Sequence, residues 1–333
     1  MSNYKVGIVG ATGAVGQEML QVLQSRNFPL AEVQLFASER SAGKTLKTPF
    51  GKKKIQPFSV EAASQMDFVL LAVSGDFARD FAKKLTKKTI VIDNSSAFRN
   101  HKKIPLVVPE VNAQAIQQAK LIANPNCTTA ILAVALYPLF RKFGLRKLIV
   151  STYQAVSGAG AKGIQELKQA TQEALAGKKV TQAVFPYPIA FNLLPQIDTF
   201  QPNGYTREEM KVVLETRKIF AAPDLPISCT AVRVPTFRAH AEAVTIETQK
   251  PLSAKVAREV LAQAAGVKIT DDPVKLIYPQ PRTATQNFAI EVGRLRQSLV
   301  FGKHGLDFFI CGDQLLKGAA LNAVQILEEI IKC

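Results

Sequence analysis

The first third of the chain alternates short apolar runs with helical stretches, and this alternation constrains the fold more than any other feature. Apolar runs over residues 5–9, 33–36, 68–73 and 90–92 are separated by segments of helical periodicity such as 15–23. Strands that alternate with helices form parallel sheets, which are buried on both faces. The sequence therefore predicts a parallel α/β sheet here.

A glycine-rich turn follows the first apolar run. The segment Gly10-Ala-Thr-Gly13-Ala-Val-Gly16 continues residues 6–9, and a helix is expected to begin near Ala14. Glycines in such a turn let the backbone approach a pyrophosphate, whose charge the helix N-terminus stabilises. The spacing is GxxGxxG rather than GxGxxG, and a glycine-rich turn can also serve only to relieve crowding. In this context the turn favours a dinucleotide site formed by Gly10, Thr12, Gly13, Ala14 and Val15.

The second predicted strand, residues 33–37, ends at Ser38-Glu-Arg-Ser41. An NAD enzyme usually places a carboxylate here against the ribose 2′-hydroxyl, whereas an arginine flanked by hydroxyls suits a 2′-phosphate. Glu39 can serve NAD in another orientation, or face solvent. The pattern favours NADP, bound by Ser38, Arg40 and Ser41.

The middle and the end of the chain predict a second domain. Residues 147–154 and 230–248 look like strands, while 162–175 and 208–220 have helical periodicity. We expect a dinucleotide-binding domain over 1–125 and an α+β domain over 126–313. The last segment, 314–333, is expected to form an amphipathic helix that returns to the first domain.

Charge and cysteine content exclude several classes of protein. The net charge is +16, but the lysines lie in small scattered groups without a basic helix, so we expect no nucleic-acid partner. The charge fits a solvated surface, or steering of anionic small ligands. Four dispersed cysteines and three histidines without a metal motif predict neither a disulfide framework nor a metal site. With neither a secretion signal nor a membrane-spanning stretch, the pattern indicates the cytoplasm.

Two residues are candidates for the catalytic chemistry, one as a nucleophile and one as an acid/base. Cys127 lies where a helix is expected to begin, and the amide dipoles there favour a thiolate. A free cysteine is otherwise often buried and inert. His240 falls in a segment where Arg238, His240 and Glu242 share one face if the segment is a strand. It is the best available proton shuttle, although a lone histidine can be structural.

Four segments resemble aspartate-semialdehyde dehydrogenases, and the resemblance spans essentially the whole chain. They are Asn124-Pro-Asn-Cys-Thr-Thr129, Tyr153-Gln-Ala-Val-Ser-Gly-Ala-Gly160, residues 233–240, and Gly312-Asp-Gln-Leu-Leu-Lys-Gly-Ala-Ala320. The resemblance implies a Rossmann-type NADP-binding domain followed by an α+β catalytic and dimerisation domain of the glyceraldehyde-3-phosphate-dehydrogenase-like type. It also implies a homodimer.

The same resemblance implies a reaction and the residues that carry it. The reaction is the reversible, NADP-dependent reductive dephosphorylation of L-aspartyl 4-phosphate to L-aspartate 4-semialdehyde, which feeds lysine (through diaminopimelate), threonine and methionine synthesis. Cys127 is the implied nucleophile and His240 handles the proton, while Asn126 and Gln154 position the reacting group. The other implied contacts are Arg233 for the substrate carboxylate, Glu208 for its amine, Arg99 and Lys211 for phosphate, and Ser157, Gly158, Gln314 and Asn322 for the cofactor.

Two other functions remain open. An N-acetyl-glutamyl-phosphate reductase shares the cysteine and histidine chemistry, but an acetylated amine offers no charge to Glu208. A non-catalytic NADP-binding paralogue is the second alternative, and an intact set of site residues argues against it.

Overall fold

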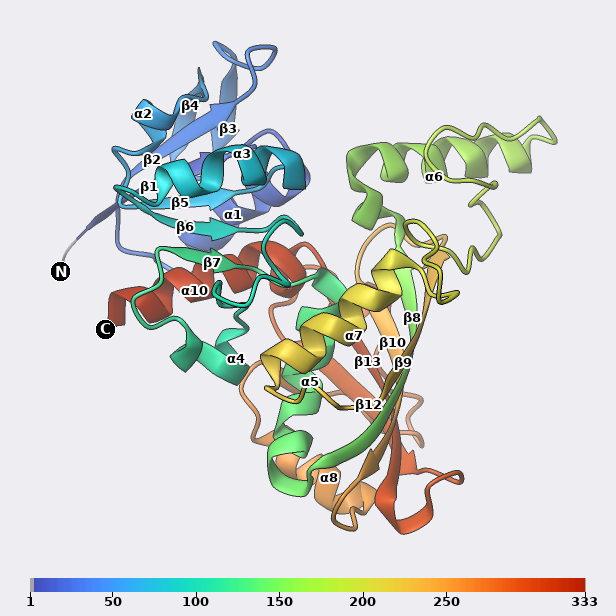
Figure 1. The fold of residues 1–333 in the computed structure, drawn as a ribbon. Coiled ribbons are helices and arrows are strands. Elements are labelled where there is room, and N and C mark those ends of the chain that lie inside the picture. Colours follow the sequence, from blue (N-terminus) through green and yellow to red (C-terminus); the bar gives the residue numbers. More distant parts are fainter. Residues whose placement is uncertain (1–2, 333) are drawn as a thin grey trace. The chain divides into compact units, whose positions relative to one another are not determined.

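The computed structural model describes residues 3–332 and divides into two compact units (Figure 1). One unit falls within Met1–Cys127 and Gly318–Cys333, and the other is Thr128–Lys317. Cys333, the last of the four cysteines, lies outside the described residues. Among the helices of the described chain, none has the combination of length and apolar character that crossing a membrane requires.

A seven-stranded sheet forms the centre of the first unit, in the order β3-β4-β2-β1-β5-β6-β7. Every pairing is parallel except that of β3 with β4, so the predicted parallel α/β sheet is confirmed. The antiparallel β3–β4 hairpin is not indicated by the apolar runs. The strands are β1 (Tyr4–Val9), β2 (Leu30–Ala37), β3 (Thr45–Thr48), β4 (Gly51–Pro57), β5 (Phe68–Leu71), β6 (Ile90–Asp93) and β7 (Leu121–Ala123).

Two helices of the first unit begin at a serine that caps them. Ser59 and Ser74 each accept a hydrogen bond from a first-turn amide, which caps α2 and α3. Chain order reverses between β1 and β5, and ligands of open α/β sheets bind at such a point. The helices are α1 (Ala14–Ser25), α2 (Val60–Ala63), α3 (Gly75–Leu85), α4 (Pro109–Asn112) and α10 (Leu321–Lys332).

The C-terminal helix begins later than its apolar spacing predicts. A π-helical turn, Leu316–Ala320, precedes α10, and Gln314 lies outside both. The reason is local, because the Asp313 carboxylate accepts the amides of Leu315 and Leu316 at 3.0 and 3.3 Å and sets the first turn. Val324 and Leu327 are fully buried, as the amphipathic pattern predicts.

The second unit contains a six-stranded mixed sheet in the order β11-β12-β13-β10-β8-β9. Figure 1 shows α5 and α7 on one face of this sheet and α6 extending away from the end of β8. Ile149 and Tyr153, on the opposite face, are 45% and 36% exposed. The elements are α5 (Cys127–Phe143), β8 (Leu145–Ala155), α6 (Gly160–Leu175), α7 (Arg207–Ile219), β9 (Ile227–Val234), β10 (His240–Thr248), α8 (Ala254–Ala262), β11 (Val267–Ile269), α9 (Pro281–Ala284), β12 (Ile290–Gln297) and β13 (Gly305–Gly312).

One predicted strand segment is interrupted. The sequence pattern predicts that Arg238, His240 and Glu242 share one strand face. Residues 235–239 instead connect β9 to β10, so Arg238 lies outside the strand that carries the other two. The connection is needed because β8 lies between β9 and β10 in the sheet. Pro235 and the left-handed Ala239 (φ 66°) bound this connection.

Candidate active site

The glycine-rich turn of the first unit leads directly into α1. Gly10 has φ 85°, and a Cβ there would lie 2.2 Å from the Ala72 carbonyl oxygen. A Cβ on Gly16 would lie 2.5 Å from the Gly10 carbonyl oxygen, so the helix packs directly on the turn. The N-cap of α1 is Gly13, without a side-chain cap or an acidic first-turn residue. Backbone amides of Ala14 and Val15 therefore begin a helix whose N-terminus suits a phosphate.

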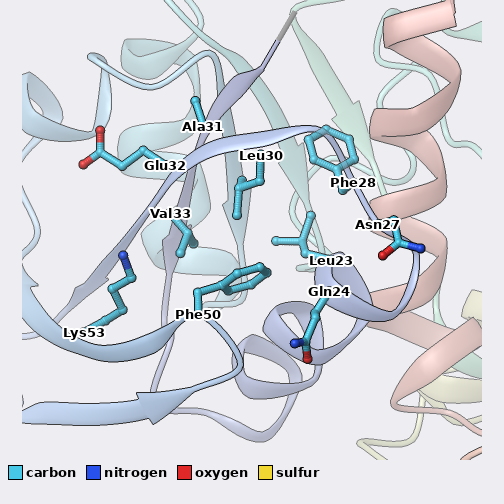
Figure 2. A pocket seen from close by; sticks show the side chains of 10 residues that line it. All are labelled: Leu23, Gln24, Asn27, Phe28, Leu30, Ala31, Glu32, Val33, Phe50 and Lys53. Carbon is cyan, nitrogen blue, oxygen red and sulfur yellow. The ribbon is translucent and has the colours of Figure 1, made fainter. Parts of the chain in front are cut away.

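The segment predicted to select the cofactor lies at the carboxyl end of β2, beside the end of β1. Ser38 and Arg40 are exposed, Ser41 is half-buried, and the Ser41 amide donates to the Ser38 carbonyl at 2.8 Å in a turn. Figure 2 shows a different pocket, which is lined by Leu30, Glu32 and Val33 at the amino end of β2. Its volume is about 380 Å³. The pocket and the cofactor segment lie at opposite ends of β2, because Leu30 is the first residue of this strand and Ser38 follows its last residue.

Arg99 and Asn322 lie near the ends of β6 and β7. Arg99 is 8% exposed and donates to the carbonyl oxygens of Asn124 (2.9 Å) and Asn94 (2.8 Å). The fully buried Asn322 donates to the Asn124 side chain at 2.7 Å and to the Val107 carbonyl at 2.8 Å. Its Oδ1 atom is buried and has no hydrogen-bond partner within the described chain. A buried acceptor of this kind normally requires a donor.

Cys127 is the first residue of α5, as the sequence predicts, and it is half-buried. The other two described cysteines, Cys229 and Cys311, are buried, and desolvation raises the pKa of each thiol well above its usual range. Asn126, directly before Cys127, is 6% exposed. A Cβ on Gly318 would lie 2.6 Å from the Cys127 Cβ, so a glycine is required at this close approach.

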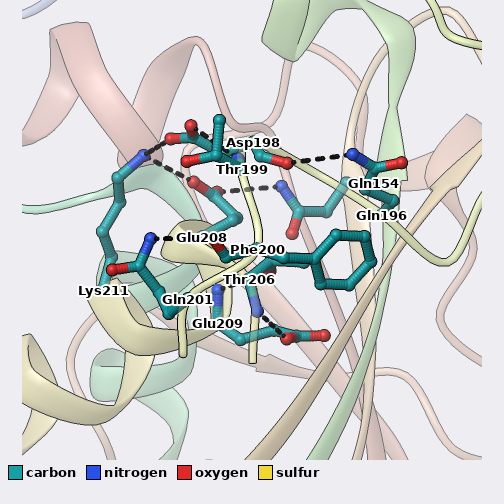
Figure 3. A network of polar contacts seen from close by, with 10 residues as sticks. All are labelled: Gln154, Gln196, Asp198, Thr199, Phe200, Gln201, Thr206, Glu208, Glu209 and Lys211. Atoms are coloured by element: carbon teal, nitrogen blue, oxygen red, sulfur yellow. Dashed lines mark hydrogen bonds and ion pairs between the residues drawn. The ribbon is translucent and has the colours of Figure 1, made fainter. Parts of the chain in front are cut away.

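A polar network in the second unit connects three predicted residues (Figure 3). The Gln154 amide donates to Glu208 Oε1 at 3.2 Å, and Lys211 Nζ donates to Glu208 Oε2 at 2.9 Å and to Asp198 Oδ2 at 3.0 Å. Burial opposes the charge on Lys211, but the two carboxylates outweigh it and raise its pKa. The capping box of Thr206 and Glu209 is present, which fixes the helix that carries Glu208 and Lys211.

Arg233 and His240 meet at the end of β8. The Ala155 amide donates to His240 Nδ1 at 3.1 Å, and Arg233 donates to the Ala155 carbonyl at 2.7 Å. Nδ1 therefore accepts, which places the ring proton on Nε2, a buried atom without a partner among the described residues. Burial and then the Arg233 charge lower the pKa of His240 to about 3. A Cβ on Gly158 would lie 2.7 Å from the Arg233 guanidinium.

Ser157 and Gln314 contact each other. The Gln314 amide donates to Ser157 Oγ, and its oxygen accepts the Ala239 amide at 2.8 Å. Both side chains are buried. Ala239 directly precedes His240 in the sequence. Its amide therefore connects the Ser157–Gln314 pair, which is predicted to contact the cofactor, to the backbone of His240.

Comparison with known proteins gives matches over nearly the full chain. Residues 5–119 match a family described as semialdehyde dehydrogenase, NAD binding domain, and residues 136–317 match semialdehyde dehydrogenase, dimerisation domain. An aspartate-semialdehyde dehydrogenase from Synechocystis sp. is 47% identical, over 99% of this chain and 98% of that protein. The Bacillus subtilis protein of the same name is 42% identical, over 98% and 97%. The chain belongs to the aspartate-semialdehyde dehydrogenase family.

Solved structures agree with this membership. The crystal structure of aspartate semialdehyde dehydrogenase II complexed with ASA, from Vibrio cholerae, has a TM-score of 0.95 and 41% identity, and covers 100% of this chain and 99% of that one. A Candida albicans aspartate semialdehyde dehydrogenase with NADP has a TM-score of 0.78 and 25% identity, covering 99% and 98%. The predicted fold is thus confirmed, and the protein is an oxidoreductase of amino-acid biosynthesis with an NAD(P)-binding domain.

Some residues around this semialdehyde dehydrogenase site escape sequence reasoning. Asp198, which shares Lys211 with Glu208, lies in an irregular segment whose pattern gives no signal. Asn124 is named only as part of a motif, yet its carbonyl and side chain join Arg99 to Asn322. Asp313 likewise lies within a motif, and its ion pair with Arg238 has no sequence signal.

Glu242 is a buried carboxyl two residues beyond His240 on β10. It is fully buried, and neither oxygen has a hydrogen-bond partner within residues 3–332. Desolvation raises its pKa well above the usual range, so the folded enzyme holds it protonated. The unfolded chain releases this proton above about pH 4.3, so the stability contributed by the protonated form is lost as pH rises through the folded pKa.

Glu242→Gln removes this titration. We expect the wild type to lose stability relative to the variant as pH rises above 5, by up to about 1.4 kcal/mol for each pH unit below the folded pKa of Glu242. Thermal unfolding of both proteins across this range measures the difference. His240 titrates in both proteins and cancels. Parallel pH profiles of the two melting temperatures would show that Glu242 is not protonated by burial.

Proposed function

We propose that the enzyme catalyses the reversible, NADP-dependent reductive dephosphorylation of L-aspartyl 4-phosphate to L-aspartate 4-semialdehyde. One observation carries this proposal: the second unit brings Gln154, Glu208, Lys211, Arg233 and His240 together around the ends of β8 and β10. This set offers cations for a carboxylate and a phosphate, and an anion for an ammonium group. A small substrate that carries all three charges fits it.

Cys127 is the proposed nucleophile. In the direction of aldehyde oxidation, its thiolate adds to the C4 carbonyl and forms a thiohemiacetal, and NADP, when bound, would supply the acceptor for the hydride that this adduct loses. The Cys127 thioester is then cleaved by inorganic phosphate, which releases aspartyl phosphate and restores the thiolate. Half-burial and a place at the start of α5 support this role, because the helix N-terminus stabilises a thiolate. We propose that Asn126 and Gln154 position the reacting carbonyl.

His240 is the proposed acid/base. In the free enzyme its Nε2–H is the buried donor that can meet the oxygen of the tetrahedral adduct, while Nδ1 is occupied by the Ala155 amide. The ring can accept a proton at Nε2 only as the other tautomer, in which Nδ1 carries the ring proton. Nδ1 must then give up its hydrogen bond with the Ala155 amide.

We propose that Arg233 binds the substrate carboxylate and Glu208 the ammonium group, with Arg99 and Lys211 for phosphate. The hydrogen bonds of Arg233 to the Ala155 carbonyl and of Arg99 to two main-chain carbonyls fix each guanidinium in direction. Lys211 is paired with Asp198 at 3.0 Å, and a phosphate would compete with that carboxylate. This assignment favours a substrate with a free ammonium group, because an acetylated amine has no charge for Glu208 to bind.

NADP is the proposed cofactor, bound by the Gly10 turn and by the segment from Ser38 to Ser41. The Asn322 Oδ1 and the Ser157–Gln314 pair, with Gly158, are proposed contacts of the nicotinamide half. The buried Asn322 acceptor supports this, since a carboxamide N–H would satisfy it. A relative of known structure carries NADP.

Arg40→Ala tests the cofactor preference. Losing a charge-assisted contact with the 2′-phosphate should raise KM for NADP about 10- to 100-fold and leave KM for NAD within about 2-fold. Steady-state kinetics with both cofactors measures this. Lys54→Ala, an exposed cation on neighbouring β4, is the matched control for general charge steering. Equal losses with NADP and NAD would mean that Arg40 does not bind the 2′-phosphate.

We propose a homodimer that forms through the uncovered face of the second sheet. Ile149 and Tyr153 are exposed there, and both lie in the segment that matches a dimerisation domain. Exposed apolar side chains on a sheet face are typical of a subunit interface. Sedimentation velocity should give twice the mass of one chain, and a monomer at micromolar concentration would contradict the proposal.

We also propose the cytoplasm as the location, in the synthesis of lysine, threonine and methionine. The three described cysteines form no disulfide with one another, and a reducing compartment keeps a nucleophilic thiol available.

An assay of the purified enzyme tests the whole proposal. Phosphate-dependent reduction of NADP with aspartate semialdehyde should be rapid, whereas N-acetylglutamate semialdehyde should give less than about 1% of that rate, because Glu208 then meets no ammonium group. Comparable rates would favour the acetylated substrate class, and no activity from folded protein would indicate a non-catalytic paralogue.

A further inference from the structure

His240 lies at the end of the strand pair that β10 and β13 form. His240 is the first residue of β10, and it pairs with Gly312, the last residue of β13. Strand pairing ends at this point, so something else must fix the backbone on either side. The direction of the His240 ring depends on the position of this backbone, because only the Nδ1 atom of the ring has a hydrogen-bond partner among the described residues.

Two side chains from one segment hold the residues just before His240. The Asp313 carboxylate accepts Arg238 Nε at 2.7 Å, and Gln314 Oε1 accepts the Ala239 amide at 2.8 Å. Asp313 directly follows Gly312, the residue opposite His240. The contacts therefore tie together the two chain segments that flank the His240–Gly312 pair.

The backbone held in this way is strained. Ala239 has φ 66°, a left-handed conformation that a residue with a Cβ adopts only when its surroundings impose it. Its side chain is fully buried, as is that of Asp313. Without the Arg238 and Gln314 contacts, Ala239 would relax and rotate the peptide that leads into His240.

Asp313 is itself fixed by the main chain. Its Oδ2 also accepts the Gln286 amide at 2.7 Å, and its Oδ1 accepts the amides of Leu315 and Leu316. The carboxylate thus has a rigid support on one side and Arg238 on the other. Supporting contacts of this kind keep the backbone around a catalytic residue within the narrow tolerance that proton transfer needs.

We propose that Asp313, acting through Arg238, is a positioning residue for His240. The inference rests on the proposed acid/base role of His240 and extends it. The Asp313–Arg238 ion pair fixes the left-handed Ala239 and therefore the direction in which His240 Nε2 points. Neither residue is proposed to contact the substrate or the cofactor.

Three variants test this proposal in the full-length enzyme. Arg238→Gln should lower kcat about 10- to 100-fold, since a misplacement near 1 Å costs up to about 10²-fold, and leave KM for NADP within about 2-fold. Arg238→Lys keeps the charge and should retain most of kcat. Asp313→Asn should resemble Arg238→Gln, and because Asp313 also binds main-chain amides, the Arg238 variants keep the test valid if Asp313→Asn fails to fold.

Asp271→Asn is the matched control. Asp271 also pairs with an arginine, Arg258, and accepts two main-chain amides, those of Arg294 and Leu295, but it lies beside β11 at the edge of the sheet. It should lose thermal stability and keep kcat. If Arg238→Gln and Asp271→Asn both lose only stability, the positioning role is overturned. If His240→Asn is fully active, the proposed function of His240 has failed instead, whatever the Asp313 variant does.

Discussion

Cys127→Ser abolishes turnover, with an expected loss in kcat on the order of 10⁴-fold or more, because a hydroxyl at this position is a far weaker nucleophile than a thiolate. The loss should appear in both directions of the reaction, since each passes through the Cys127 thioester. NADP binding should not change, because the Gly10 turn and Arg40 are separate from the nucleophile in sequence and chemistry. Stopped-flow kinetics and fluorescence titration with NADPH measure the two quantities.

The control for this variant is another cysteine. Cys229→Ala removes a thiol that is 2% exposed and whose pKa burial raises. It should cost some stability through the cavity that it leaves, with kcat nearly unchanged. Cys127→Ser with more than about a tenth of wild-type turnover would rule out covalent catalysis by this residue.

His240→Asn has the second largest expected effect. We expect kcat to fall about 10²- to 10⁴-fold, the usual contribution of a positioned acid/base, with KM for NADP little changed. Asparagine retains an N–H donor of similar reach but cannot transfer a proton. The variant therefore separates a hydrogen-bond role from proton transfer. Single-turnover hydride transfer, followed by NADPH absorbance, is the direct measurement.

A second histidine provides the control for this variant. His304, in the turn between β12 and β13, has Nδ1 at 3.1 Å from the Thr248 carbonyl oxygen. His304→Asn should keep wild-type kcat. If His240→Asn retains most of its hydride-transfer rate, the Nε2–H acts only as a donor to the oxygen, and another group moves the proton.

Local patterns predict those parts of the fold that depend on local interactions. The parallel strands, the helix that begins at Cys127, and the Thr206–Glu209 capping box all follow from spacing along the chain. Glu208 and Lys211 are also three residues apart and pair as expected. In each case the interacting residues lie within one helix, or the apolar residues recur with the period of the helix or strand.

The rest depends on contacts between distant segments. Gln154 and Glu208 are 54 residues apart, and Arg238 and Asp313 are 75 apart, so no periodicity links them. A continuous strand over 230–248, as the pattern predicts, gives the wrong position for Arg238. The sheet instead inserts β8 between β9 and β10 and requires a connection there. Tertiary contacts therefore decide this part of the site.

The most direct test of covalent catalysis is to trap the intermediate. Enzyme mixed with aspartate semialdehyde and NADP, without phosphate, should accumulate an acyl adduct, because nothing is present to cleave the thioester efficiently. Intact-mass and peptide mass spectrometry should locate one aspartyl group on Cys127, and addition of phosphate should remove it. Steady turnover without any adduct, or an adduct on Cys229 or Cys311, would contradict the assignment of Cys127 as the nucleophile.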